Sequence, residues 1–165
     1  MLAATEDIRT VLGALRKMDR PVRRVMIAGG GKVGLRLARS LVGQCQVKLI
    51  ERDRKRRDYL AGQLPSSMLV LHGDGTDEDL LQDEQVGQMD LFLALSSDDE
   101  DNILAAMLAK RLGANRVIAL INRSAYVDLV QGGEIDIAIS PAQATVGPLL
   151  SKIRRGDMVA VHSLR

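Results

Sequence analysis

The stretch Val25-Met26-Ile27-Ala28-Gly29-Gly30-Gly31-Lys32-Val33-Gly34 joins a short apolar run to a glycine-rich turn. Gly29, Gly31 and Gly34 stand at the fixed positions of the pattern G-x-G-x-x-G. This pattern uses one glycine for a tight turn, one where the backbone must approach a pyrophosphate, and one where helix and strand pack closely. A helix that begins here presents its free N–H groups and the positive end of its dipole to the turn. The stretch therefore predicts a strand, a turn and a helix that together bind the phosphates of a nucleotide.

Glu51 follows a second apolar strand, residues 46–50. It lies about 20 residues beyond the glycines, which is where an acid binds the ribose hydroxyls in dinucleotide-binding folds. A carboxylate at this place accepts hydrogen bonds from the hydroxyls and repels a 2′-phosphate. The sequence thus favours NAD(H), or adenosine without a 2′-phosphate, over NADP(H), although the adjacent Arg52 weakens that preference. The alternative interpretation of Glu51 is a solvated acid at a strand end.

The composition is that of one globular domain with flanking pieces. The chain has 165 residues, 46% of them hydrophobic and 27% charged, with a net charge of +2. Its single cysteine, Cys45, cannot form an internal disulfide, which fits the reducing cytoplasm. No apolar run is long enough to cross a bilayer, so we expect no direct membrane insertion. The basic cluster at 52–57 is typical of a solvated helix face, and aromatic residues are too few, at 2%, to favour nucleic-acid binding.

Apolar runs alternate with helical patterns along most of the chain. The expected strands are 25–29, 46–51, 68–72, 90–95, 116–121 and 136–139, and the expected helices are 32–42, 54–63, 77–84, 99–112 and 124–130. This alternation predicts an α/β fold, a parallel sheet with helices on both faces. With right-handed crossovers and the glycine turn after the first strand, we expect a Rossmann-like, doubly wound, six-stranded sheet of order 3-2-1-4-5-6. Ser97-Asp98-Asp99-Glu100 predicts a capping box at the start of the helix over 99–112.

Amphipathic segments flank the sheet domain, which we assign to residues 21–141. Apolar residues recur at helical spacing from Ile8 to Met18 and again from Val146 to Ile153, which predicts an N-terminal connecting helix over 1–20 and a C-terminal helix over 142–155. Burial of one such side chain is worth about 1.5–3 kcal/mol, so each stripe needs an apolar partner. We expect that partner either in another subunit of a homo-oligomer, a dimer or a tetramer, or in a further domain. Packing against the chain's own sheet is the alternative.

Taken together, several segments resemble the RCK/KTN domains, most closely the second nucleotide-binding domain of regulators of Trk-type potassium uptake. The segments are Val25–Gly34, Leu49–Asp53, His72–Asp77, Ala94–Asn102 and Ile137–Pro141. The resemblance covers roughly residues 20 to 155. It implies that 1–20 ends a connecting segment, that 142–155 is a crossover helix at a subunit interface, and that 156–165 begins a C-terminal domain that is cut short.

The resemblance also implies a nucleotide site. It places the phosphates at 29–34, with the ribose at Glu51, the adenine edge near Asp74, and the mouth of the crevice at the end of the fourth strand. The implied cofactor-binding residues are Gly29, Gly30, Gly31, Lys32, Val33, Gly34, Glu51, Arg52, Asp74, Gly75, Thr76, Leu95 and Ser96. From the residues alone, Asp74 equally fits a turn and Lys32 a solvated side chain.

The function implied is an NAD(H)-binding regulatory domain in the cytoplasm. It would couple nucleotide binding to the gating of a membrane potassium transporter subunit at the inner face of the plasma membrane. ATP or ADP in the same site is an alternative, because family members that bind either ligand share these residues; Asn122 and Arg123 are candidates for contacts to a nicotinamide. A cofactor-binding fragment of an NAD-dependent dehydrogenase is the second alternative. Hydride transfer needs a placed acid or base, and His72 and His162 fit that role poorly, so we expect no enzyme activity.

Overall fold

The six strands form one parallel sheet, as the alternating pattern predicts. The computed structural model describes residues 22–130 and 132–140 of the chain. The strands are β1 (Arg24–Ala28), β2 (Gln46–Glu51), β3 (Leu69–His72), β4 (Leu91–Ala94), β5 (Arg116–Leu120) and β6 (Ile137–Ile139). All pair in parallel in the order β3-β2-β1-β4-β5-β6, which confirms the predicted doubly wound topology. The order reverses between β1 and β4, and these two strands are neighbours at the centre of the sheet.

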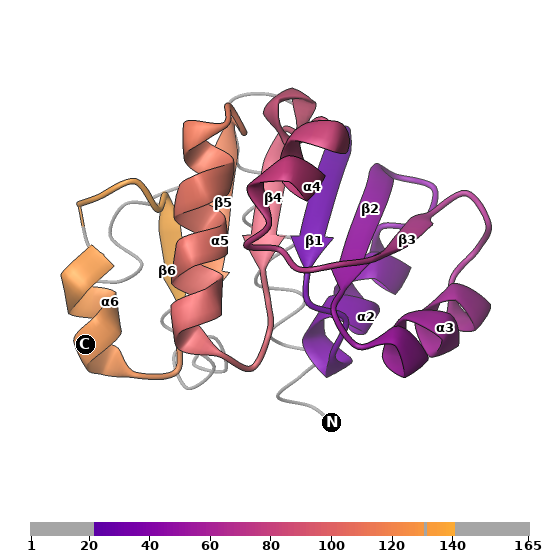
Figure 1. Ribbon diagram of the computed structural model, residues 1–165, viewed down its shortest axis with the longest axis horizontal. Coiled ribbons are helices and arrows are strands. Elements are labelled where there is room, and N and C mark those ends of the chain that lie inside the picture. Colours follow the sequence, from indigo (N-terminus) through magenta and orange to yellow (C-terminus); the bar gives the residue numbers. More distant parts are fainter. Residues whose placement is uncertain (1–21, 131, 141–165) are drawn as a thin grey trace.

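Helices cover both faces of the sheet (Figure 1). They are α2 (Lys32–Ser40), α3 (Arg54–Gln63), α4 (Glu78–Asp83), α5 (Asp99–Arg111) and α6 (Ser124–Val130), and a short 3₁₀ turn, η1 (Val86–Gln88), precedes β4. Two separate apolar cores result. Leu37 of α2 and Leu60 of α3 pack on one face, whereas Leu81 of α4, Ala106 of α5 and Val127 of α6 pack on the other. Because both faces are covered, β4 is apolar and buried throughout, and β1 is apolar and buried from Val25 to Ala28, as expected for a buried parallel sheet.

Aspartates cap three of these helices. The Asp53 carboxylate accepts the Arg56 N–H at the start of α3, and the Asp77 carboxylate accepts N–H groups at the start of α4. Helix α5 begins at Asp99, as predicted, but its N-cap differs from the prediction by one residue. Asp98, not Ser97, is the N-cap, and its Oδ1 accepts the Asp101 N–H at 2.9 Å. The capping box predicted at Ser97 was therefore wrong. The sequence did not separate the two positions, because Ser and Asp are both favoured N-cap residues.

Several expectations fall outside the described residues. These are the connecting helix at 1–20, the interface helix at 142–155 and the start of a further domain at 156–165. Within residues 22–130 and 132–140, none of the helices combines the length and apolarity needed to cross a bilayer.

Candidate functional site

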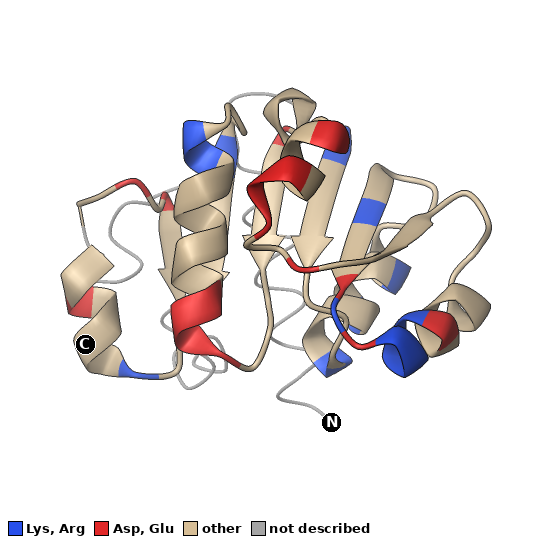
Figure 2. Ribbon diagram, viewed as in Figure 1, with Lys and Arg blue, Asp and Glu red and all other residues tan. Residues whose placement is uncertain are grey.

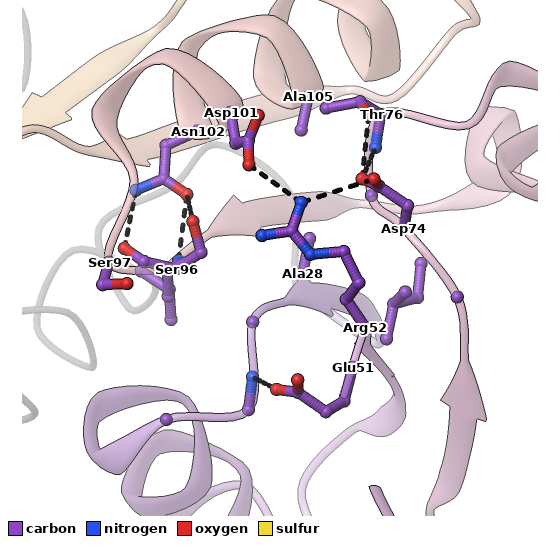
Figure 3. Close-up of a pocket in the computed structure, with 17 residues that line it drawn as sticks. Ala28, Glu51, Arg52, Asp74, Thr76, Ser96, Ser97, Asp101, Asn102 and Ala105 are labelled. Carbon is purple, nitrogen blue, oxygen red and sulfur yellow. Dashed lines mark hydrogen bonds and ion pairs between the residues drawn. The ribbon is translucent and has the colours of Figure 1, made fainter. Parts of the chain in front are cut away.

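A cleft of about 240 Å³ opens at the carboxyl ends of the central strands, beside the point where the strand order reverses. In doubly wound sheets this is where ligands bind. The predicted residues that line it are Gly29, Gly30, Gly31, Glu51, Arg52, Asp74, Gly75, Thr76, Leu95 and Ser96. The other three, Lys32, Val33 and Gly34, lie in the first turn of α2 and do not line the cleft. Figure 3 shows the cleft walls converging from β2, the loop after β3, and α5.

Each glycine of the turn meets a different structural demand. Gly29 has φ of +116°, and a Cβ there would lie 2.6 Å from the Ser96 backbone nitrogen. A Cβ on Gly34 would overlap the carbonyl oxygen of Gly29, so this position must be small for α2 to pack on β1. A Cβ on Gly31, in contrast, would meet no atom within 4 Å. The fold thus requires glycine at 29 and 34, whereas the space at Gly31 is open.

Glu51 is held at the end of β2 by two backbone amides. Its Oε1 accepts the Gly30 N–H at 2.9 Å, and its Oε2 accepts the Asp53 N–H at 2.8 Å. These contacts tie the carboxylate to the glycine turn on one side and to the start of α3 on the other. A carboxylate has about four lone-pair sites, so each oxygen can still accept a further hydrogen bond. The arrangement presents a fixed anionic acceptor to the cleft, contrary to the alternative of a freely solvated acid.

Arg52 bridges two carboxylates across the cleft (Figure 3). Its guanidinium lies 3.2 Å from Asp101 of α5 and 3.6 Å from Asp74 after β3. The other Asp74 oxygen, Oδ1, accepts the backbone N–H and the hydroxyl of Thr76 at 2.9 and 2.8 Å. The bond from the Thr76 N–H, with help from the Thr76 hydroxyl and the Arg52 charge, lowers the pKa of Asp74 below its usual value. Asp74 is therefore both a turn residue and a charged wall of the cleft.

Asn102 shapes the wall at the end of β4, a role that was not predicted from the sequence. Its side chain is 1% exposed; Oδ1 accepts the Ser96 N–H and hydroxyl, and Nδ2 donates to the carbonyl oxygens of Ser96 and Leu120. The residue joins the end of β4 to the end of β5. A signal was present in the sequence, because Asn102 lies one turn before the buried Ala105 and Ala106 on the apolar face of α5. A polar residue on such a face needs internal partners.

Asn122 and Arg123 bind the first turn of α5 through their backbone N–H groups. Their backbone N–H groups donate to the two oxygens of Asp99, which is 5% exposed, at 2.8 and 2.9 Å. Neither residue lines the cleft. These contacts fix the loop between β5 and α6 to the first turn of α5, and they give no support to the predicted contact with a nicotinamide.

Charged residues are unevenly distributed over the helices (Figure 2). Acidic residues gather on α4 and at the first turn of α5, and basic residues gather at the start of α3. No carboxylate lies in the first turn of α2, and its N-cap, Gly31, has no side chain to bind the amides there. The turn before α2 is thus the part of the cleft best suited to an anion.

Comparisons with known proteins agree on one family. A sequence model of the TrkA-N domain matches residues 25–141. Over 164 residues the chain is 54% identical to the Trk system potassium uptake protein TrkA of Halomonas elongata, covering 99% of this chain and 36% of that protein. The chain thus spans about a third of the length of this curated relative.

Solved structures share the fold at low sequence identity. The GsuK channel bound to NAD superposes with a TM-score of 0.62 at 18% identity, covering 74% of this chain and 22% of that one. A structure of GsuK bound to ADP superposes with a TM-score of 0.63 at 20% identity, covering 93% of this chain and 38% of that one.

Proposed function

Because this chain belongs to the TrkA-N domain family, we propose that it is an NAD(H)-binding regulatory domain of a Trk-type potassium-uptake system. One observation carries the proposal. The open backbone at Gly31 and the anchored Glu51 carboxylate line the same cleft at the strand-order reversal. A diphosphate and the ribose next to it require these two features side by side.

In the proposed complex the phosphates bind at the glycine turn and the first turn of α2. Gly31 would supply an open backbone amide, and Lys32 a nearby positive charge. The free lone pairs of Glu51 would accept hydrogen bonds from the ribose hydroxyls. The adenine would lie toward Asp74, and the ligand would continue past Ser96 if it carries a second nucleotide. Asp74 and Ser96, beside which this arrangement places the adenine and the second nucleotide, both line the cleft.

The surroundings of Glu51 favour a ligand without a 2′-phosphate. Arg52 is the cation beside the ribose position, and it already pairs with Asp74 and Asp101. A 2′-phosphate would therefore lie near the carboxylates of Glu51, Asp74 and Asp101, and the nearest cation, the Arg52 guanidinium, is already paired with two of them. NAD(H) and ADP or ATP share the adenosine diphosphate group that the proposed site would bind. GsuK has been solved with NAD and with ADP, and both remain candidate ligands here.

We propose a regulatory role and no catalytic one. A bound nucleotide shifts a conformational equilibrium only by its difference in affinity for the two states. In the whole protein those states would be two arrangements of neighbouring domains or subunits in a cytoplasmic homo-oligomer. The two arrangements would act differently on a potassium transporter subunit at the inner membrane face. The charged side chains of the cleft are bound to the backbone or to one another, as in a site that holds a ligand in place. A dehydrogenase fragment is the competing function.

Calorimetric titration tests the proposal. The chain, freed of copurified nucleotide, is titrated with NAD, NADH, ADP, ATP and NADP. We expect saturable binding of NAD(H), of ADP or ATP, or of both, and much weaker binding of NADP. NADH oxidation is then assayed with small keto acids and aldehydes. Turnover above background would favour the dehydrogenase, and the absence of binding by every nucleotide would refute the proposed site.

A further inference from the structure

Gly30 is held at both of its polar backbone groups by side chains from outside the turn. Its N–H donates to Glu51 Oε1 at 2.9 Å, and its carbonyl oxygen accepts a hydrogen bond from Arg56 Nε at 2.7 Å. Glu51 ends β2, and Arg56 lies in the first turn of α3. Both partners are charged, and hydrogen bonds to charged groups are stronger than neutral ones. The two peptide planes that meet at Gly30 are therefore fixed in orientation.

The bond from Arg56 sets the direction of the next amide. In a trans peptide the carbonyl and the following N–H point in opposite directions, and the described chain contains no cis peptide bond. Because the Gly30 carbonyl points at α3, the Gly31 N–H points away from α3. Gly31 lines the cleft, and the space around its Cα is open there. This amide is the one that a phosphate in the turn would meet first.

Arg56 is itself held in place. Its backbone N–H donates to Asp53 Oδ2 at 3.1 Å, and its guanidinium lies 4.9 Å from the centre of the Tyr59 ring, a cation–π contact. Arg56 is half-buried, whereas Arg54 and Lys55 beside it are exposed. The basic cluster, interpreted from the sequence as a solvated face, thus contains one residue with a defined contact to the glycine turn.

We infer that Arg56 is a positioning residue for phosphate binding, which acts by orienting the Gly30–Gly31 peptide toward the ligand. The inference rests on the proposed function. The Arg56 guanidinium binds the Gly30 carbonyl oxygen, and Arg56 does not line the cleft. It therefore acts through the glycine turn and not by direct contact with the nucleotide. Loss of Arg56 should therefore weaken ligands through their phosphates alone.

The test compares a ligand that has phosphates with one that has none. ADP and adenosine are titrated into the full chain and into Arg56→Met, which keeps an apolar stem, and Arg54→Met, which removes the same charge from an exposed neighbour. In Arg56→Met we expect ADP affinity to fall about tenfold or more and adenosine affinity to stay within about twofold. Arg54→Met should leave both unchanged, and Arg56→Lys, which keeps a charged donor, should restore part of the ADP affinity.

Three results would overturn the inference. They are ADP affinity within about twofold of the wild type in Arg56→Met, equal losses in Arg56→Met and Arg54→Met, or parallel losses of ADP and adenosine. The second would point to summed charge alone, and the third to a general structural role. If Arg56→Met does not give a cooperative thermal melt, Arg56→Gln serves for the same comparison. Failure of the proposed function is distinct, because the wild-type chain would then bind no nucleotide, and the inference would fall with it.

Discussion

Substitution of Gly31 separates ligand binding from folding. Gly31 is the N-cap of α2 with φ of −73°, outside the left-handed region, and a Cβ there meets nothing within 4 Å. Valine is a poorer N-cap than glycine, but it also reduces the entropy of the unfolded chain, so we expect Gly31→Val to change stability by less than about 1 kcal/mol. In the folded chain its two methyl groups would occupy the space in front of the amides that the phosphate must reach.

The expected loss of affinity is large. Hydrogen bonds from amides to a charged group are worth about 1.5–3 kcal/mol each, so loss of two costs about 3–6 kcal/mol, at least a hundredfold in affinity. Calorimetric titration with NAD and ADP measures the loss, and a thermal melt verifies the fold. Gly62→Val in α3, where a Cβ also meets nothing within 4 Å, is the matched control and should bind normally. Nucleotide affinity within threefold of the wild type in folded Gly31→Val would refute the reasoning.

Other substitutions test the remaining walls of the cleft. Glu51→Gln should weaken adenosine binding by about 1–3 kcal/mol, because it removes a charge and turns an NH₂ group toward a backbone N–H; calorimetry giving an unchanged Kd would count against a ribose contact. Asn102→Ala should lower the free energy of unfolding in urea by about 2–4 kcal/mol, because it removes the buried Asn102 amide and leaves the partly buried Leu120 carbonyl and its neighbours without this partner; a loss below about 0.5 kcal/mol would show that the network contributes little. The lowered pKa of Asp74 means that its carboxylate stabilises the fold above its ordinary pKa of about 3.9, and that this contribution is lost as pH falls through the lower folded pKa. The Tm of the wild type should therefore exceed that of Asp74→Asn at pH 7 and converge with it in acid, and a gap that persists at pH 2 would contradict this.

The sequence was sufficient to predict the sheet, because its signals are local and repeat. Each strand had an apolar core of residues, each helix followed at regular spacing, and the glycine turn indicated the first crossover, so the strand order followed from general rules. The N-cap of α5 was misplaced by one residue because Ser97 and Asp98 are adjacent and both residue types cap well.

Contacts between distant residues could not be predicted in the same way. Arg56 stood in a run of basic residues, and nothing local distinguished it from Arg54. Its contact with Gly30 depends on how α3 packs beside the turn, 26 positions away in sequence. Asn102 likewise joins the ends of β4 and β5 only because α5, which carries it, packs against both of these strands. Such residues are identified in the structure, where a polar side chain of a helix donates a hydrogen bond to a backbone carbonyl oxygen at or just beyond a strand end.

A crystal structure of the chain grown with saturating NAD or ADP tests the central claim most directly. We predict the diphosphate within hydrogen-bonding distance of the Gly31 amide and the first turn of α2, with the ribose hydroxyls on Glu51. A cleft that contains only solvent under these conditions, or a nucleotide bound elsewhere on the chain, would contradict the account.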